Sequence, residues 1–298
     1  MRALVIGFGS IGRRHYEVLS ALGHEVHVLT SQSLDGVKTY KNFSEIELSE
    51  FDYFVIATPT NEHYKNLKFL NQNVKNKIIF CEKPLFGSKK EPLKLENSVF
   101  VGYVLRYHPL LLRLKDELKN EKVILAQAKC AQYLPTWRPN SDYRKCYSSD
   151  KARGGGVLLD LSHEIDYLLW LLGDFKISFG VDAKISDLEI SSDDFCAFFG
   201  KGKSGVVISA SLDYISKIMQ RTLLVETFEK TFLLDFITGS LKIADKKGGI
   251  LEFQVNLERN EMFSAMHSDI LGERKIACNY DFGLKTMGVI EEIRKGRR

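Results

Sequence analysis

A glycine pattern directly after a short apolar segment constrains the fold of this chain more than any other feature. Ala3 to Ile6 reads Ala-Leu-Val-Ile, which predicts a strand buried on both faces of a sheet. Gly7, Gly9 and Gly12 follow with the spacing G-x-G-x-x-G, and apolar residues from Ser10 to Leu22 recur at helical intervals. A strand, this turn and a helix, in that order, predict a Rossmann domain whose helix N-terminus binds the diphosphate of a dinucleotide.

Strands and helices alternate over the first third of the chain. A helix is predicted over Asn61–Leu70, and this alternation is typical of βαβ units in a parallel sheet. We therefore expect an α/β chain with an N-terminal Rossmann NAD(P)-binding domain over residues 1–105. Its further strands are predicted at Glu25–Leu29, Tyr53–Ala57, Ile78–Cys81 and Ser98–Tyr103.

The pattern changes beyond residue 105, where short β-rich runs follow one another up to about residue 255. Consecutive strands predict a C-terminal α+β domain over residues 106–298, with a large, mostly antiparallel sheet. We expect this domain to bind substrate and to support oligomerisation. Its helices are predicted at His108–Lys119, Val157–Leu172, Glu258–Leu271 and Gly283–Arg294.

Composition excludes several classes of partner. The 42 basic and 38 acidic residues leave a net charge of +4, which is too small to favour nucleic-acid binding. The basic C-terminus, Arg294 to Arg298, is interpreted as solvated. No apolar run reaches the roughly 18 residues that span a bilayer, and Met1 leads directly into a predicted strand without a signal peptide. Five cysteines without a C-x-x-C pair predict neither a disulfide framework nor a metal site, so we expect a cytoplasmic protein.

The end of the second strand bears on the choice of cofactor. NAD-binding domains tend to place an acidic residue there for the ribose 2′-hydroxyl, whereas this chain has Thr30 and Ser31. Without a carboxylate, these hydroxyls and Arg13 could bind a 2′-phosphate, which favours NADP(H) slightly over NAD(H). Asp35 keeps NAD(H) open.

Polar residues follow the third and fourth strands, where ligands bind in an open parallel sheet. Lys83 lies between Glu82 and Pro84 and could polarise a substrate oxygen, although a surface ion pair with Glu82 explains it equally well. The residues predicted to bind the cofactor are Gly7, Phe8, Gly9, Ser10, Ile11, Gly12, Arg13, Thr30, Ser31, Thr58, Pro59, His63, Glu82 and Lys83.

Three glycines, Gly154 to Gly156, precede the most apolar predicted helix of the second domain. Asp160 and His163 are three residues apart in it, so we expect them on one helical face, where an aspartate can orient an imidazole. A hydrogen-bonded core histidine is the alternative interpretation.

Together, these motifs resemble the Gfo/Idh/MocA family, which includes glucose–fructose oxidoreductase and inositol 2-dehydrogenase. The glycine turn, Ala57-Thr58-Pro59 with His63, Glu82-Lys83-Pro84 and the GGG…D…HEID segment occur in the family's order. The resemblance implies that Lys83 orients the substrate hydroxyl, that His163 accepts its proton and that Asp160 binds substrate or supports His163. Many members space these last two residues as D-x-x-x-H, which makes the role of Asp160 less secure here.

Residues 132–147 form an aromatic and arginine-rich loop, which is interpreted either as a substrate loop or as a structural one. Aromatic rings can stack on sugars and guanidinium groups can bind a carboxylate or phosphate, which favours an anionic or nucleotide-linked sugar. The loop also resembles that of family members in bacterial surface-polysaccharide biosynthesis, which implies a substrate from that process. The residues predicted to bind substrate are Arg106, Tyr107, Trp137, Arg138, Tyr143 and Arg144.

The sequence thus predicts an NAD(P)-dependent oxidoreductase acting on a secondary alcohol or ketone of a sugar, in a homodimer or homotetramer. Two alternatives remain open. One is an enzyme that reduces a non-sugar C=O or C=N bond, or that uses a tightly bound dinucleotide without net redox. The other is a protein that senses dinucleotide or redox state without catalysis.

Overall fold

The chain forms two compact units, and each unit is made of two separate segments of the sequence. The computed structural model describes residues 1–138, 141–258 and 260–296. Unit 1 consists of Met1–Tyr107 and Glu258–Lys285, and unit 2 of His108–Leu257 and Thr286–Arg298. The first division lies close to the predicted boundary at residue 105, but the prediction had assigned residues 258–285 to the second domain. Five residues from predicted segments lie outside the described residues: Pro139, Asn140, Arg259, Arg297 and Arg298.

Unit 1 contains a seven-stranded sheet with the order β15-β6-β5-β4-β1-β2-β3. Its strands pair in parallel except at β15, which runs antiparallel to β6. This sheet and its glycine turn confirm the predicted Rossmann architecture. The strands are β1 (Arg2–Ile6), β2 (Glu25–Leu29), β3 (Thr39–Tyr40), β4 (Tyr53–Ile56), β5 (Ile78–Cys81), β6 (Ser98–Val101) and β15 (Cys278–Asn279).

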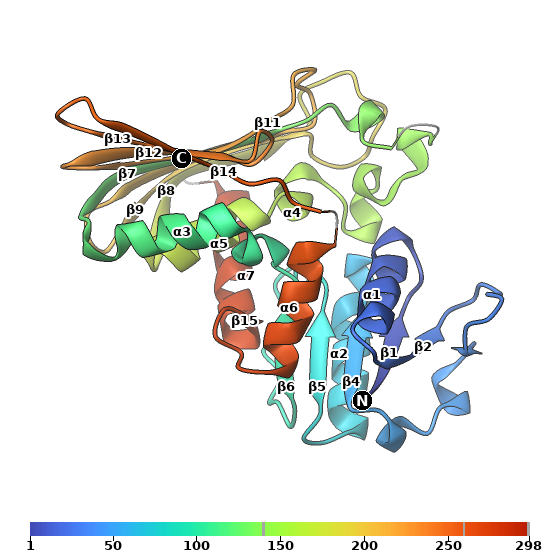
Figure 1. The fold of residues 1–298 in the computed structure, drawn as a ribbon. Coiled ribbons are helices and arrows are strands. Elements are labelled where there is room, and N and C mark those ends of the chain that lie inside the picture. The colour runs from blue at the N-terminus through green and yellow to red at the C-terminus, as the bar shows by residue number, and fades with distance from the viewer. Residues whose placement is uncertain (139–140, 259, 297–298) are drawn as a thin grey trace. The chain divides into compact units, whose positions relative to one another are not determined.

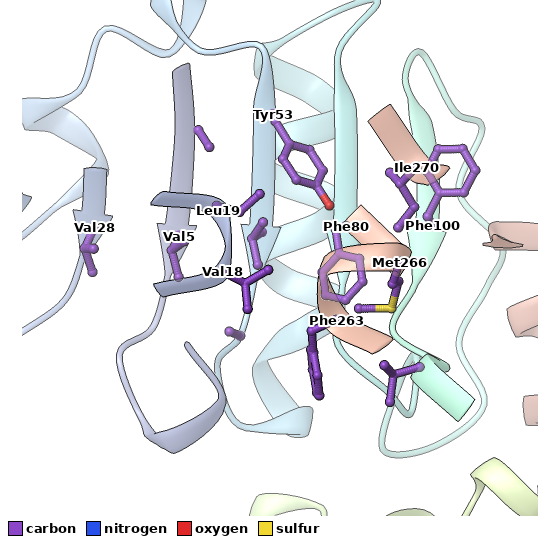
Figure 2. Packing of buried hydrophobic residues seen from close by; sticks show 14 of the residues in the cluster. Val5, Val18, Leu19, Val28, Tyr53, Phe80, Phe100, Phe263, Met266 and Ile270 are labelled. Carbon is purple, nitrogen blue, oxygen red and sulfur yellow. The ribbon is translucent and has the colours of Figure 1, made fainter. Parts of the chain in front are cut away.

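Residues 258–285, called the returning segment below, complete the core of unit 1. Alternate residues of β4 and β5 point to one face of the sheet, where Tyr53 and Phe80 are fully buried. In α6 (Glu261–Leu271), Phe263, Met266 and Ile270 recur at helical spacing and pack against this face, as Figure 2 shows. α6 also contacts α1 (Ser10–Ala21), whereas α2 (Thr60–Asn73) contacts β4 and β5.

Unit 2 contains an eight-stranded sheet with the order β14-β13-β12-β11-β7-β10-β9-β8. β7 and β10 pair in parallel and the other neighbours are antiparallel, which confirms the prediction of a mostly antiparallel sheet. Figure 1 shows its long, curved strands. They are β7 (Val123–Ala131), β8 (Phe175–Ala183), β9 (Phe195–Gly202), β10 (Val207–Asp213), β11 (Gln220–Thr227), β12 (Lys230–Asp235), β13 (Ser240–Asp245) and β14 (Ile250–Gln254).

Helices cover one face of this sheet. Along β9, residues such as Phe198 are buried towards that face, whereas Phe199 on the opposite face is 54% exposed. Phe179 is paired with Phe199 in the register and is also exposed, so this face presents aromatic side chains to solvent. The helices of unit 2 are α3 (Pro109–Glu117), α4 (Val157–Asp160), α5 (His163–Leu172) and the latter half of α7 (Tyr280–Lys295), which begins in unit 1.

Short 3₁₀ helices fill several connections. In unit 1 they are η1 (Phe43–Glu45), η2 (Leu48–Glu50) and η3 (Val104–Tyr107); in unit 2 they are η4 (Leu118–Asn120), η5 (Leu134–Thr136), η6 (Tyr143–Lys145), η7 (Tyr147–Ser149) and η8 (Lys151–Arg153). Across the described ranges, the structure contains no helix with both the length and the apolar character needed to cross a membrane.

Candidate functional site

The glycine turn after β1 is held by steric demands at two of its three glycines. Gly7 has φ +94°, and a Cβ there would lie 2.7 Å from the carbonyl oxygen of Ala57. A Cβ on Gly12 would lie 2.1 Å from the carbonyl oxygen of Gly7, because α1 crosses the turn closely. These two positions therefore require glycine for the fold itself.

Gly9 differs, because a Cβ there would meet no atom within 4 Å. It is the N-cap of α1, which has no side-chain cap and no acidic residue in its first turn. The first-turn amides of a helix lack intrahelical partners, and their dipoles favour an anion. An exposed glycine backbone beside such amides fits the diphosphate of a dinucleotide. Of the neighbouring predicted residues, Phe8 is buried, Ile11 is half-buried, and Ser10 and Arg13 are exposed.

The turn after β2 is tied to the glycine turn. The side-chain amide of Gln32 donates to the carbonyl oxygen of Phe8 at 3.0 Å, and the backbone amide of Gln32 donates to the Thr30 hydroxyl at 3.2 Å. The Arg13 guanidinium lies 4.9 Å from the centre of the Phe8 ring. Thr30 is buried and Ser31 is exposed, so they contribute differently to the turn.

His63 connects two loops at the ends of parallel strands. Its Nδ1 lies 3.0 Å from the carbonyl oxygen of Pro84, and its Nε2 lies 3.0 Å from that of Thr58. The ring is 1% exposed, and burial lowers its pKa. Thr58 and Pro59 are half-buried in the loop that it fixes. In unit 1, His63 therefore connects the loop of Thr58 and Pro59 to the loop that contains Pro84, which directly follows Lys83.

Glu82 is committed to contacts other than the surface ion pair considered from the sequence. One carboxylate oxygen lies 2.9 Å from Nε2 of His15, and the other accepts from the backbone amide of Lys83 at 3.0 Å. A Cβ on Gly102 would lie 2.9 Å from this carboxylate, so glycine leaves the room that it occupies. The Glu82 side chain thus fixes the backbone from which Lys83, itself half-buried, projects.

A buried hydrogen-bond chain continues from Glu82 to α6. Nδ1 of His15 lies 2.9 Å from Nε2 of His267, and Nδ1 of His267 lies 2.9 Å from the hydroxyl of Tyr53. Burial lowers the pKa of His267 well below its usual value, so its ring is neutral. Since a carboxylate can only accept, Nε2 of His15 donates to Glu82, and the four side chains form one continuous buried chain from Glu82 to Tyr53.

Arg106 and Tyr107, predicted to bind substrate, lie against the returning segment of unit 1. The Arg106 guanidinium donates to the carbonyl oxygen of Ile276 and lies 4.2 Å from the centre of the Phe282 ring. The Tyr107 hydroxyl donates to Asp269 at 2.9 Å. Both side chains are at least 95% buried, so their observed contacts are structural ones within unit 1.

Each of the three glycines before α4 has its own cause in unit 2. Gly154 is left-handed, with φ +87°, and ends η8. A Cβ on Gly155 would lie 2.3 Å from the carbonyl oxygen of Tyr147, and one on Gly156 would lie 2.2 Å from the carboxylate of Asp193. That carboxylate accepts from the amide of Leu158 at 2.9 Å and so caps α4.

Asp160 and His163 lie on different helices, which corrects the prediction of one helix over Val157–Leu172. α4 ends at Asp160 because Leu161, with φ −97° and ψ 26°, leaves helical geometry, and α5 begins at His163. The two residues therefore do not lie on one face of a single helix. Asp160 instead accepts from the Tyr214 hydroxyl at 2.7 Å, and both Asp160 and His163 are 9% exposed.

The loop of residues 132–147 borders a small pocket in unit 2. The Trp137 ring meets the Tyr214 ring edge-on at 5.0 Å, which links this loop to Asp160. Among the described residues, the buried Nε1 of Trp137 has no hydrogen-bond partner. The pocket is lined by Leu134, Pro135, Trp137, Arg138, Ser141, Tyr143, Cys146 and Ser148.

The two arginines of this loop differ in availability. Arg138 is exposed at the pocket, whereas Arg144 pairs with Asp142 at 2.9 Å and with Glu189 at 3.2 Å. The Tyr143 hydroxyl accepts from the Glu189 amide. Arg144 would have to exchange these carboxylates before it could bind an anionic substrate.

A second buried polar cluster in unit 2 surrounds Phe236. Arg221 pairs with Glu164 through two contacts, at 2.8 and 3.1 Å, and the Glu164 side chain is fully buried. His108 meets the Phe236 ring edge-on and Tyr167 stacks on it. Burial and the nearby Arg221 lower the pKa of His108 to about 4, so this ring is neutral at pH 7.

Comparison with protein families places the first unit. Residues 1–96 match the model of the Gfo/Idh/MocA oxidoreductase family, described as having an NAD-binding Rossmann fold. This N-terminal segment is therefore similar to that family, in agreement with the predicted resemblance. A search of curated proteins finds no match.

Solved structures show that the fold of the whole chain is also shared. UDP-N-acetylglucosamine 3-dehydrogenase GnnA from Acidithiobacillus ferrooxidans matches with a TM-score of 0.81 at 18% identity, over 99% of this chain and 97% of that one. Levoglucosan dehydrogenase, in complex with NADH and levoglucosan, matches with a TM-score of 0.82 at 15% identity, over 99% of this chain and 96% of that one. WlbA dehydrogenase from Bordetella pertussis, in complex with NADH and UDP-GlcNAcA, matches with a TM-score of 0.77 at 15% identity, over 99% of this chain and 95% of that one.

Three residues that the sequence analysis did not select contribute to these sites. His267 and Tyr214 lie far along the chain from the groups they contact, and no local spacing connects them. Lys41 lies beside the turn after β2, as described below. Its proximity to that turn in sequence was the one available signal.

Proposed function

We propose that this protein is an NAD(P)-dependent oxidoreductase that transfers hydride between the nicotinamide and a secondary alcohol or ketone of a sugar. The observation that carries the proposal is the open backbone at Gly9 in a Rossmann domain of an oxidoreductase family. The bound cofactor would supply the hydride acceptor. The similar structures include two dehydrogenases with bound NADH, which supports the same class of reaction.

Separate roles are proposed for two residues. Lys83 stabilises charge that develops on the substrate oxygen, and the Glu82 carboxylate holds the backbone amide of Lys83 in place. His163 accepts the hydroxyl proton during oxidation and returns it during reduction. Asp160, held by Tyr214, binds substrate or supports His163.

We further propose an anionic or nucleotide-linked sugar as substrate. The unpartnered indole N–H of Trp137 suits a ligand oxygen, and the exposed Arg138 suits a carboxylate or phosphate. Arg144 is a weaker candidate, because its two ion pairs already satisfy its charge. Similar structures that act on or contain UDP-sugars support this substrate class.

Two finer features belong to the same proposal. The hydroxyl-rich turn after β2 favours NADP(H) over NAD(H). The exposed sheet face of unit 2, with Phe179, Phe199, Val207 and Leu233, would bury apolar surface in a homodimer or homotetramer.

The first test measures dinucleotide binding by the Gly9→Ala variant in a fluorescence titration. The variant should fold, because its methyl group meets open space, but should bind NADH and NADPH about tenfold more weakly or worse. Gly288→Ala in α7 is the matched control, since its Cβ also meets no atom within 4 Å, and it should bind normally. Undiminished binding by Gly9→Ala would remove the main support for the proposal.

The second test is turnover on a panel of nucleotide sugars and sugar acids. Lys83→Met and His163→Asn should each lower kcat by about 10² to 10⁴. His163→Asn should also leave dinucleotide affinity unchanged, because His163 is not among the residues predicted to bind the cofactor. Binding without turnover on any alcohol would instead favour a dinucleotide sensor. A dinucleotide that survives purification and turns over without net redox would favour the other enzymatic alternative.

A further inference from the structure

The ammonium group of Lys41 lies at the turn that follows β2. Its Nζ donates to the carbonyl oxygen of Gln32 at 2.7 Å and to that of Ser31 at 3.1 Å. An ammonium group has three N–H donors, so one remains for another acceptor. A fixed positive charge therefore stands beside the position where Rossmann domains distinguish the ribose 2′ substituent.

Backbone register places Lys41 there. β3 pairs in parallel with β2, with Leu29 opposite Tyr40, and the amide of Thr30 donates to the carbonyl oxygen of Tyr40 at 3.0 Å. The residue after β3 consequently lies beside the residues after β2. Both strands end at the edge of the sheet where ligands bind.

The charges around this turn favour an anion. Residues 30–34 contain no carboxylate, and Asp35 is the first acidic residue after them. The Arg13 guanidinium lies over the Phe8 ring, and the Gln32 side chain donates to the carbonyl oxygen of Phe8. Glu45 is an acidic group close to Lys41, and its carboxylate accepts from the Lys41 backbone amide at 2.9 Å and from the Asn42 side chain at 3.1 Å. Within the described part of the chain, the Lys41 Nζ donates to two backbone carbonyl oxygens, which are uncharged groups.

We propose that Lys41 binds the adenosine ribose 2′-phosphate and thereby makes this protein select NADP(H) over NAD(H). The inference rests on the proposed NADP(H) preference and assigns it to a residue. The Ser31 hydroxyl, on the exposed side of the same turn, supplies a second donor. Lys41 thus takes the place of the arginine that often accompanies a 2′-phosphate.

Two ligands that differ only in the 2′-phosphate isolate this contact. Calorimetric titration of the full chain with adenosine 2′,5′-bisphosphate and with adenosine 5′-monophosphate requires neither substrate nor turnover. The informative variant is Lys41→Met, and Lys41→Arg tests whether charge restores the effect. Lys38→Met is the matched control, because Lys38 is exposed in the same short segment.

Lys41→Met should weaken binding of the bisphosphate about tenfold to a hundredfold, the usual range for one hydrogen bond to a charged group. The monophosphate should bind as in wild type, Lys41→Arg should keep most of the discrimination, and Lys38→Met should change neither ligand. The inference is overturned if Lys41→Met weakens both ligands equally, as a purely structural role of the turn predicts. It is also overturned if neither affinity changes, or if the wild-type protein does not prefer the bisphosphate. Failure of the sugar reaction would leave all of these binding results unchanged, so the two failures are distinguishable.

Discussion

Replacement of His267 by phenylalanine tests whether the buried chain from Tyr53 to Glu82 is energetically connected. The substitution keeps an aromatic ring among Phe80, Phe263 and Tyr53 but removes both ring nitrogens. It leaves the Tyr53 hydroxyl and Nδ1 of His15 buried without their partners. Each unpaired buried group costs about 1–3 kcal/mol, so the variant should lose roughly 2–6 kcal/mol of stability. That is a large part of the 5–15 kcal/mol typical of a folded domain.

A second substitution, Tyr53→Phe, should change stability in opposite directions in the wild-type and His267→Phe backgrounds. Tyr53→Phe alone leaves Nδ1 of His267 unpaired and should cost about 1–3 kcal/mol. Added to His267→Phe, the same change removes an unpaired hydroxyl, so the double variant should be more stable than His267→Phe alone.

Hydrogen–deuterium exchange of the intact protein measures this locally. Peptides from β1, β4 and β5 should exchange faster in His267→Phe and recover partly in the double variant, while peptides from β9 and β10 in unit 2 stay constant. If Tyr53→Phe destabilised the His267→Phe background further, the proposed coupling between these groups would be refuted.

Two further predictions concern unit 2. Since the folded pKa of His108 is about 4, below its ordinary 6.5, the unfolded state binds an extra proton between these pH values, and the free energy of unfolding should fall as pH drops from 6.5 to 4, by about 3 kcal/mol in all. Urea unfolding at pH 7 and pH 5 should show a smaller loss in His108→Gln than in wild type; equal losses would count against a neutral, buried His108. Phe199→Glu, on the exposed sheet face, should lower the oligomeric state measured by light scattering while leaving the fold intact, whereas Gln72→Glu, exposed in α2 of unit 1, is a control that adds the same charge elsewhere. An unchanged mass for Phe199→Glu would exclude this face as the interface.

The sequence predicts the N-terminal unit well because its signals are local. Steric demands confine Gly7 and Gly12 to glycine, and the flanking strand and helix lie within a few residues of them. Apolar periodicity likewise identifies β1, β2, β4 and β5. The later strands alternate weakly, because one face of their sheet is covered and the other exposes residues such as Phe199.

The contacts that position the candidate site were predicted less well, because they join distant segments. Tyr214 meets Asp160 across 54 positions, and His267 meets His15 across 252, so no spacing rule applies to either pair. The helix break between Asp160 and His163 was missed because every residue from Val157 to Leu161 is apolar or helix-compatible. The break appears only in the backbone angles of Leu161.

The return of residues 258–285 to unit 1 also has a consequence for the order in which the protein is made. Domains usually fold as they emerge from the ribosome, N-terminal domain first. Here residues 1–107 emerge without α6 and β15, so the Tyr53 and Phe80 side of their sheet waits uncovered during synthesis of all of residues 108–257. Unit 1 is therefore begun before residues 108–257 but completed after them, and a stop codon before α6 would leave the sheet formed by residues 1–107 without part of its cover.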